Sequence, residues 1–448
     1  MNLHNMKILV IGLGKTGIAT ARFLLGQGAR VVTTDSKAVS ELENVIKDLK
    51  SLSPHVEFAG YDLNVLSGMD MIIPSPGVTP SNFLLSEAMR RNIPIISELE
   101  LACRFLKTPV IAITGTNGKT TTTTLIGKIL SEAGKSVFIG GNIGNPLIGY
   151  VDGKQDADYA VVEVSSFQLQ WAQRFRPHIS LLLNTTCDHV DYHGSFEAYR
   201  TTKERIFENQ TKHDFAILNG NDPHTPALEK KLSAGVLLFS TTRQVNDGIF
   251  LDQNRLIFKG PDGMQEDYPL GMIKIPGLHN VENCMAAVMA ARLCGCSPAQ
   301  ITRTIDDFKG IAHRIEFTEE KLGVKFYDDS KGTNVGAVVR ALESFSQPII
   351  LLLGGRDKEG DFATLAPLIK DKVKEVLLFG EARQRINDLI GGIVKTTSVA
   401  TLREAIETAE RNAVSGDVVL LSPGCASFDE FSNYKERGQF FKDVVRNL

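Results

Sequence analysis

The stretch TGTNGKTT, residues Thr114 to Thr121, decides the fold of this chain. It follows a short apolar run at 109–113 that is rich in β-branched residues and predicts a buried parallel strand. After it, residues 122–132 carry apolar side chains at helical spacing. A strand, a glycine-rich turn and a helix N-terminus surround an anion with backbone N–H groups, and the helix dipole adds to the attraction. The stretch therefore predicts a phosphate-binding loop.

Two side chains in this loop suit a nucleoside triphosphate. Lys119 offers a positive charge to the outer phosphates, and the Thr120 hydroxyl is positioned to bind Mg²⁺. The usual G-x-x-x-x-G-K-[ST] pattern is incomplete, because Ile113 stands where that pattern has glycine. We still interpret the segment as ATP-binding. The residues expected to contact the nucleotide here are Thr116, Asn117, Gly118, Lys119, Thr120, Thr121 and Thr122.

Bulk composition narrows the class of protein. A chain of 448 residues predicts about three domains, and 43% hydrophobic with 23% charged residues is typical of a globular protein. The net charge of -3 argues against a sequence-independent nucleic-acid binder. No apolar run approaches the roughly 18 residues of a membrane span, and the N-terminus lacks a signal-peptide layout. Six cysteines, mostly in apolar segments, look like reduced core residues. These features predict a cytoplasmic protein.

The first segment has the layout of a dinucleotide fold. A strand at 7–11 leads into the G-x-G-x-x-G turn at 12–17, and a second strand ends in Asp35. A further strand at 69–73 precedes the rigid turn at 74–78, at the edge where open α/β sheets bind ligands. The glycines are compatible with NAD, with another nucleotide diphosphate, or with tight strand–helix packing alone.

The second segment places acids and a histidine at strand ends. Glu163 ends the strand at 159–162, where it could supply a second Mg²⁺ contact or be a surface carboxylate. The strand at 180–183 precedes a polar loop that contains His189, whose neutral ring nitrogen could bind a metal. A lone histidine is more often structural, but this setting favours function. Residues 230–267 read as meandering strands.

The third segment repeats one pattern. Strands at 324–327, 348–353 and 417–421 each run into a polar or glycine-rich loop, which predicts a third α/β unit with its loops on one edge. The fold class is therefore α/β with three domains. Residues 1–97 are expected to form a Rossmann-like domain and residues 98–310 a central P-loop ATPase-like parallel sheet. The last domain, 311–448, is again expected to be Rossmann-like.

Several motifs together resemble the bacterial Mur ligases, ATP-dependent enzymes that form the amide bonds of the peptidoglycan stem peptide. T-G-T-N-G-K-T at 114–120 is shared with the related folylpolyglutamate synthetases. G-L-G-K-T-G at 12–17, S-P-G at 75–77, D-S-K-G-T-N at 329–334 and S-P-G-C-A-S-F-D-E-F at 422–431 resemble the member that adds D-glutamate to UDP-N-acetylmuramoyl-L-alanine. The resemblance covers essentially the whole chain. It implies a UDP-binding rather than an NAD-binding first domain.

The resemblance also implies the chemistry and the contacts. ATP converts the terminal carboxylate of the substrate to an acyl phosphate, which the incoming amine attacks. ATP and two Mg²⁺ ions are the expected cofactors, and the chain is expected to be a monomer. Metal ligands are Thr120, Glu163, His189 and Lys203; further ATP contacts are Asn280, Asn283, Arg314 and Asp329. Implied UDP contacts are Lys15, Thr16, Asp35, Ser36, Ser75 and Gly77, and implied D-glutamate contacts are Thr333, Lys358, Ser427, Phe428 and Tyr434. Asn142 and Lys331 are further implied substrate contacts. Lys119, His189 and Lys203 are the implied catalytic residues.

Lys203 has two opposite interpretations. Its segment, 199–205, is charged and helical, so the residues alone favour a solvated face. The resemblance implies instead a carbamylated lysine, because carbamylation turns the cation into an anion that can hold Mg²⁺ beside His189.

Three alternatives remain open on the sequence. A ligase of the same superfamily could use a different amino acid, although the alanine-adding relative usually has histidine where Asn117 stands, and folylpolyglutamate synthetases lack the N-terminal glycine-rich domain. A nicotinamide-dependent oxidoreductase would rest on Gly12, Gly14 and Gly17 alone. A P-loop switch or motor would use ATP to control binding rather than to make a bond.

Overall fold

The computed structural model describes every residue except 54–55, 187–189, 262 and 358–359. The chain forms two compact units. One comprises Met1–Met272 and Glu282–Ile305, and the other comprises Ile273–Val281 and Asp306–Leu448. The first unit contains two β-sheets and the second unit contains one.

The first sheet is a parallel sheet of four short strands in the order β3-β2-β1-β4. Its core follows the period of two in the sequence, since Ile8 and Val10 face one hydrophobic cluster while Leu9 and Ile11 face another. The expected nucleotide-type turn follows β1, and its third glycine is required by packing: a Cβ on Gly17 would lie 1.9 Å from the Gly12 carbonyl oxygen. The elements are β1 (Lys7–Ile11), α1 (Lys15–Gly26), β2 (Arg30–Thr34), α2 (Val39–Leu52), β3 (Val56–Phe58), η1 (Leu63–Leu66), β4 (Met71–Pro74) and α3 (Phe83–Arg90).

The second sheet has nine strands in the order β13-β12-β11-β10-β9-β8-β5-β7-β6. It is parallel from β6 to β11, and β11, β12 and β13 form an antiparallel meander, as the sequence predicted. The strands are β5 (Val110–Thr114), β6 (Val137–Gly141), β7 (Tyr159–Glu163), β8 (Ile179–Leu182), β9 (Phe215–Asn219), β10 (Gly235–Ser240), β11 (Gly248–Asp252), β12 (Arg255–Lys259) and β13 (Gln265–Pro269).

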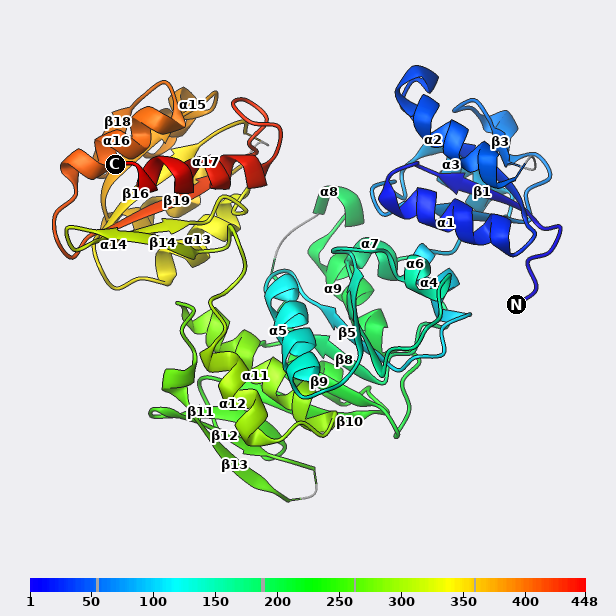
Figure 1. The fold of residues 1–448 in the computed structure, drawn as a ribbon, viewed down its shortest axis with the longest axis horizontal. Helices are drawn as coiled ribbons and strands as arrows, with labels where there is room; N and C mark the ends of the chain where they lie inside the picture. Colours follow the sequence, from blue (N-terminus) through cyan, green and yellow to red (C-terminus); the bar gives the residue numbers. More distant parts are fainter. Residues whose placement is uncertain (54–55, 187–189, 262, 358–359) are drawn as a thin grey trace. The chain divides into compact units, whose positions relative to one another are not determined.

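Helices join and cover these strands (Figure 1). The first two sheets share one hydrophobic cluster, in which Leu147 and Ile148 of α6 pack with residues of both sheets. The helices are α4 (Glu98–Cys103), α5 (Lys119–Glu132), α6 (Leu147–Val151), α7 (Ser166–Leu169), α8 (Val190–His193), α9 (Phe196–Glu204), η2 (Arg205–Phe207), α10 (Thr225–Glu229), η3 (Leu270–Met272), α11 (Leu278–Leu293) and α12 (Pro298–Asp306).

The third sheet has the order β14-β15-β19-β16-β17-β18 and is parallel except for β14 at its edge. Helices α13, α14 and α15 contribute to the core on one face, and α16 and α17 to the core on the other (Figure 1). Since Asp328 pairs with Leu421 and Gly354 with Gly424, the loops after β15, β16 and β19 gather at one edge, as predicted. The elements are β14 (Glu316–Lys321), β15 (Val324–Asp328), α13 (Val335–Glu343), β16 (Ile349–Gly354), η4 (Phe362–Leu365), α14 (Ala366–Lys372), β17 (Val373–Phe379), α15 (Arg383–Ile390), β18 (Lys395–Ser398), α16 (Leu402–Asn412), β19 (Val418–Gly424) and α17 (Tyr434–Arg446).

The predicted α/β class with three parallel-rich sheets is confirmed. The predicted boundaries at 97/98 and 310/311 stay a prediction. Among the described helices, none combines the length and apolar character that a bilayer crossing requires.

Candidate functional site

The phosphate loop has the predicted strand–turn–helix form. β5 ends at Thr114, and α5 begins at Lys119 after Gly118, whose φ of +84° lies in the left-handed region. A Cβ on Gly118 would also lie 2.2 Å from Oδ1 of Asn283, so both the turn and its neighbour require glycine. Asn184 fixes the loop from the next strand: its Oδ1 accepts from the Asn117 N–H at 3.0 Å, and its Nδ2 donates to the Asn117 carbonyl at 3.1 Å. The sequence had indicated no separate role for Asn184.

Two lysine ammonium groups meet at this loop. Lys119 Nζ donates to the carbonyl oxygens of Gly115 at 2.8 Å and Thr116 at 2.9 Å. Lys203 Nζ donates to the same Gly115 oxygen at 3.0 Å and lies 4.6 Å from the centroid of the Tyr199 ring. Lys203 is only 2% exposed, so the solvated face that its local sequence favours is wrong. The loop is therefore lined by two amines, a setting that suits polyphosphate.

Glu163 joins the phosphate loop to a second loop. Its Oε2 accepts from the Thr120 hydroxyl at 2.8 Å, and its Oε1 accepts from Asn142 Nδ2 at 2.8 Å. Glu163 is buried, so it is not the surface carboxylate of the alternative interpretation. A hydroxyl and a carboxylate oxygen side by side are hard oxygen donors of the kind that Mg²⁺ prefers, so the residues fit such an ion.

The glycine-rich turn of the first sheet is held by residues that were predicted to contact substrate. Asp35 Oδ2 accepts from the Leu13 N–H at 2.6 Å, and the Ser75 hydroxyl donates to the Gly12 carbonyl at 2.8 Å. Lys15 donates from Nζ to the carbonyl of Gly144, in the loop that carries Asn142. The structure thus brings two of the predicted substrate-contact regions together. Thr16, Ser36 and Gly77 belong to the same turn region and have no further described role.

A second cluster of predicted residues lies at the edge of the third sheet. Asp329 accepts from the Ser422 hydroxyl at 2.8 Å; burial raises the pKa of Asp329 to about 7, and the charge of Arg314 opposes that shift. Lys331 places its ammonium 4.1 Å from the centroid of the Tyr434 ring. Thr333 and Ser427 lie on the two neighbouring loops; Ser427 is buried, whereas Phe428 of the same loop is 58% exposed.

Of the remaining predicted residues, two are described by the structure and two are not. Asn280 and Asn283 both lie on α11; Asn280 donates to the Pro276 carbonyl at 2.6 Å, and Asn283 accepts from the Thr122 hydroxyl at 3.3 Å. His189 and Lys358 lie outside the described residues, so their roles stay predictions.

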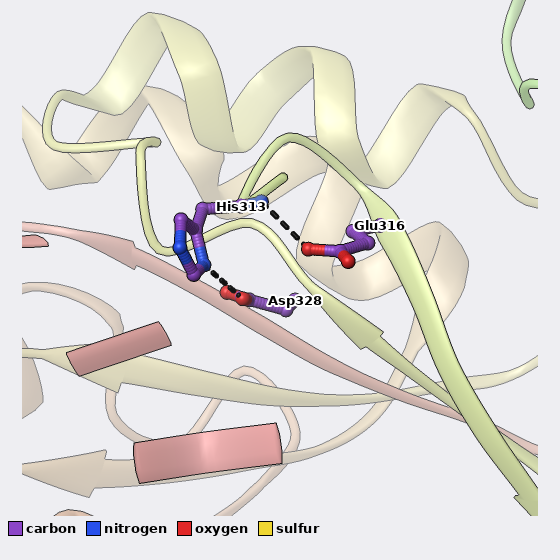
Figure 2. A group of neighbouring side chains, drawn as sticks. All are labelled: His313, Glu316 and Asp328. Carbon is purple, nitrogen blue, oxygen red and sulfur yellow. Dashed lines mark hydrogen bonds and ion pairs between the residues drawn. The ribbon is translucent and has the colours of Figure 1, made fainter. Parts of the chain in front are cut away.

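The sequence did not indicate a role for a group of three side chains at the start of the third sheet (Figure 2). His313 Nδ1 lies 2.6 Å from Asp328 Oδ2, and the His313 N–H donates to Glu316 Oε2 at 2.8 Å. Imidazole and carboxylates can bind metals, but here the imidazole bonds Asp328, while the Glu316 carboxylate accepts from the His313 backbone N–H and pairs with Lys442 at 3.0 Å. We interpret the group as a structural support. Asp328 follows His313 by 15 residues, at the end of the next strand but one, so the pair forms only through the pairing of β14 with β15.

Three family models match the chain in order. They are described as Mur ligase MurD-like, N-terminal domain, at residues 6–97; Mur ligase middle domain, at residues 113–291; and Mur ligase, glutamate ligase domain, at residues 313–425.

Curated relatives match over their whole length. The UDP-N-acetylmuramoylalanine--D-glutamate ligase of Syntrophus aciditrophicus is 60% identical over 447 residues, covering 100% of this chain and 99% of the relative. The protein of the same name from Geotalea daltonii is 46% identical over 450 residues, again covering 100% and 99%.

Solved structures agree on the fold. A pseudomurein peptide ligase type C from Methanothermus fervidus superposes with a TM-score of 0.62 at 18% identity, covering 99% of this chain and 100% of that chain. A MurF ligase from Thermotoga maritima in complex with ADP superposes with a TM-score of 0.60 at 16% identity, covering 100% and 96%. Because three Mur ligase family models match successive parts of the chain and a curated relative is 60% identical over the whole chain, the chain belongs to the Mur ligase family.

Proposed function

We propose that this chain is an ATP-dependent ligase that adds D-glutamate to UDP-N-acetylmuramoyl-L-alanine, releasing ADP and phosphate, in the synthesis of the peptidoglycan precursor. The observation that carries the proposal is the 60% identity, over the whole chain, with a relative that bears the name of this activity. The phosphate loop supplies the energy-coupling part, and the edge of the third sheet supplies polar groups for an acidic amino acid.

The reaction requires activation of a carboxylate, which is a poor electrophile. Phosphoryl transfer from ATP converts the terminal carboxylate of the UDP substrate to an acyl phosphate; the amine of D-glutamate then attacks the carbonyl carbon and phosphate leaves. Negative charge gathers on the transferred phosphoryl group, so fixed cations stabilise the transition state. Lys119 is the fixed cation at the loop where that charge would develop.

Mg²⁺ is proposed at two positions and would neutralise phosphate charge when bound. Thr120 and Glu163 would hold the first ion, and their oxygens already lie 2.8 Å apart. His189 and a carbamylated Lys203 would hold the second. Carbamylation joins CO₂ to the deprotonated amine and releases a proton, and Lys203 places its amine at the phosphate loop, 3.0 Å from the Gly115 carbonyl oxygen.

Substrate contacts are proposed by loop. The UDP substrate would bind at the turn region of the first sheet and at Asn142; nucleotide contacts would come from the phosphate loop, Asn280, Asn283, Arg314 and Asp329. D-Glutamate would bind Lys331, Thr333, Lys358, Ser427, Phe428 and Tyr434, because ammonium and hydroxyl groups suit its carboxylates. We further propose that the protein acts as a cytoplasmic monomer, which size-exclusion chromatography with light scattering would test.

Phosphate release tests the function directly. Release should require ATP, UDP-N-acetylmuramoyl-L-alanine and D-glutamate together, and replacing D-glutamate with L-alanine, glycine or L-glutamate should abolish it. An unchanged rate with ATP alone would reject the ligase in favour of an ATP-driven switch. A change in NADH fluorescence on mixing would instead support an oxidoreductase.

A further inference from the structure

Ser330 lies between two residues with different proposed tasks, Asp329 on the ATP side and Lys331 on the amino-acid side. Ser330 is fully buried, and each of its polar groups is bonded. Its N–H donates to Asp328 Oδ1 at 2.8 Å, and its hydroxyl donates to the Tyr434 carbonyl at 2.9 Å. The conformation of the loop is therefore fixed at this residue.

Arg437, the fourth residue of α17, completes the bonding of Ser330. Its Nε donates to the Ser330 hydroxyl at 2.9 Å, and its Nη2 donates to the Ser330 carbonyl at 2.9 Å. The same Nη2 donates to the Cys425 carbonyl at 3.1 Å. Cys425 belongs to the loop after β19 that carries Ser427, so one fully buried guanidinium bonds both amino-acid-side loops.

The neighbouring residues leave Arg437 little freedom. A Cβ on Gly438 would lie 2.1 Å from His313 Nδ1 and 2.6 Å from Asp328 Oδ2, so α17 packs directly against the pair shown in Figure 2. Asp328 in turn bonds the Ser330 N–H. Burial lowers the pKa of Arg437 to about 10, which still leaves the guanidinium charged near neutrality.

We infer that Arg437, acting through Ser330 and Cys425, is a positioning residue that sets the spacing of the two loops proposed to bind D-glutamate. The inference rests on the proposed assignment of Lys331, Thr333 and Ser427 to the amino acid. A guanidinium is suited to this task, because its planar N–H groups can bond several carbonyl oxygens at fixed angles. Lysine offers a single ammonium and cannot reproduce the fork.

Steady-state kinetics of Arg437→Met, Arg437→Lys and Ser330→Ala test the inference. We expect Arg437→Met to raise KM for D-glutamate about tenfold or more, because Arg437 bonds both amino-acid loops. KM for ATP should stay within about twofold, because Asp329 keeps its own bond from Ser422. Arg437→Lys should recover only part of the loss. The double variant Ser330→Ala with Arg437→Met should lose less than the product of the two single effects, since both changes remove the same bond.

Ser180→Ala is the matched control. Ser180 is also fully buried and its hydroxyl also donates to a carbonyl, that of Ile206, but in the central sheet. It should lower the thermal midpoint and leave KM for D-glutamate unchanged. If Arg437→Met fails to fold, Ser330→Ala carries the test with a smaller rise in KM.

An unchanged KM for D-glutamate in the folded variants, or equal rises in both KM values, would overturn the positioning role. Failure of the proposed function is a separate result, since it would appear as wild-type phosphate release that does not depend on D-glutamate.

Discussion

Glu163 connects the phosphate loop with the loop of Asn142. In Glu163→Gln one carboxylate oxygen becomes an amide N–H₂ that donates and cannot accept, so one of the two bonds, from the Thr120 hydroxyl or from Asn142, is lost. We expect the Mg²⁺ concentration for half-maximal activity to rise about 10- to 100-fold. Titrating Mg²⁺ in the phosphate-release assay measures this effect. Glu132→Gln is a control on α5, since Glu132 pairs with Lys128 near the surface; equal Mg²⁺ requirements for the wild type and Glu163→Gln would contradict the proposed ligand role.

The activity of a Lys203→Ala variant tests whether the buried amine of Lys203 is carbamylated. We expect Lys203→Ala to lose activity, and added formate or acetate to restore part of it by supplying the missing carboxylate. Lys128→Ala, which removes a partly exposed lysine from α5, should retain activity and show no response to these anions. No rescue, together with an unmodified Lys203 in intact-mass spectra recorded with bicarbonate, would argue against carbamylation.

Single residues show where sequence reasoning reached its limit. The places of Gly118 in the turn and of Thr120 at the start of α5 could be predicted, because a phosphate loop is a local motif. The burial of Lys203 could not be predicted from the residues, because its charged helix is covered by segments distant in sequence. The His313–Asp328 pair was missed because it forms only when the chain before β14 meets the end of β15.

At the scale of elements, Glu98 of α4 bonds the first turn of α6. Its Oε1 accepts from the Ile148 N–H at 2.7 Å, and burial raises the pKa of Glu98 to about 7, while that N–H lowers it. The folded state therefore holds this proton more tightly than the unfolded state. The associated stability is fully present below about pH 4.5 and is lost as the pH rises through about 7.

Glu98→Gln removes that ionisation while its amide oxygen can still accept from Ile148. We expect the variant to be more stable than the wild type at pH 8 by about 1–3 kcal/mol, and to lose this advantage at pH 5. Thermal unfolding at both pH values measures the difference. Glu100→Gln, on the same helix, should have the opposite sign at pH 8, because it breaks the ion pair with Arg104. A Glu98→Gln variant with the same pH dependence as the wild type would refute the explanation.

The type of an element could be predicted where its local sequence pattern matches its burial in the fold. The parallel strands β1, β5 and β16 could be predicted from continuous apolar runs, because both faces of these strands are buried. The antiparallel meander ending in β13 could be predicted in outline, whereas the position of β14 as an antiparallel edge strand could not, since pairing partners depend on the whole sheet.

At the scale of the molecule, the proposed ATP contacts are divided between the two compact units. Lys119 and Thr120 belong to the first unit, and Arg314 and Asp329 belong to the second. One nucleotide can contact both sets only when both units lie against it together. We therefore expect the small-angle scattering curve to change when a non-hydrolysable ATP analogue, Mg²⁺ and UDP-N-acetylmuramoyl-L-alanine are added, because a nucleotide bound by both units restricts their relative motion. Lys119→Ala should show a smaller change at the same ligand concentrations, because it loses a phosphate contact; unchanged scattering at ligand concentrations that raise the thermal midpoint would contradict a nucleotide shared by both units.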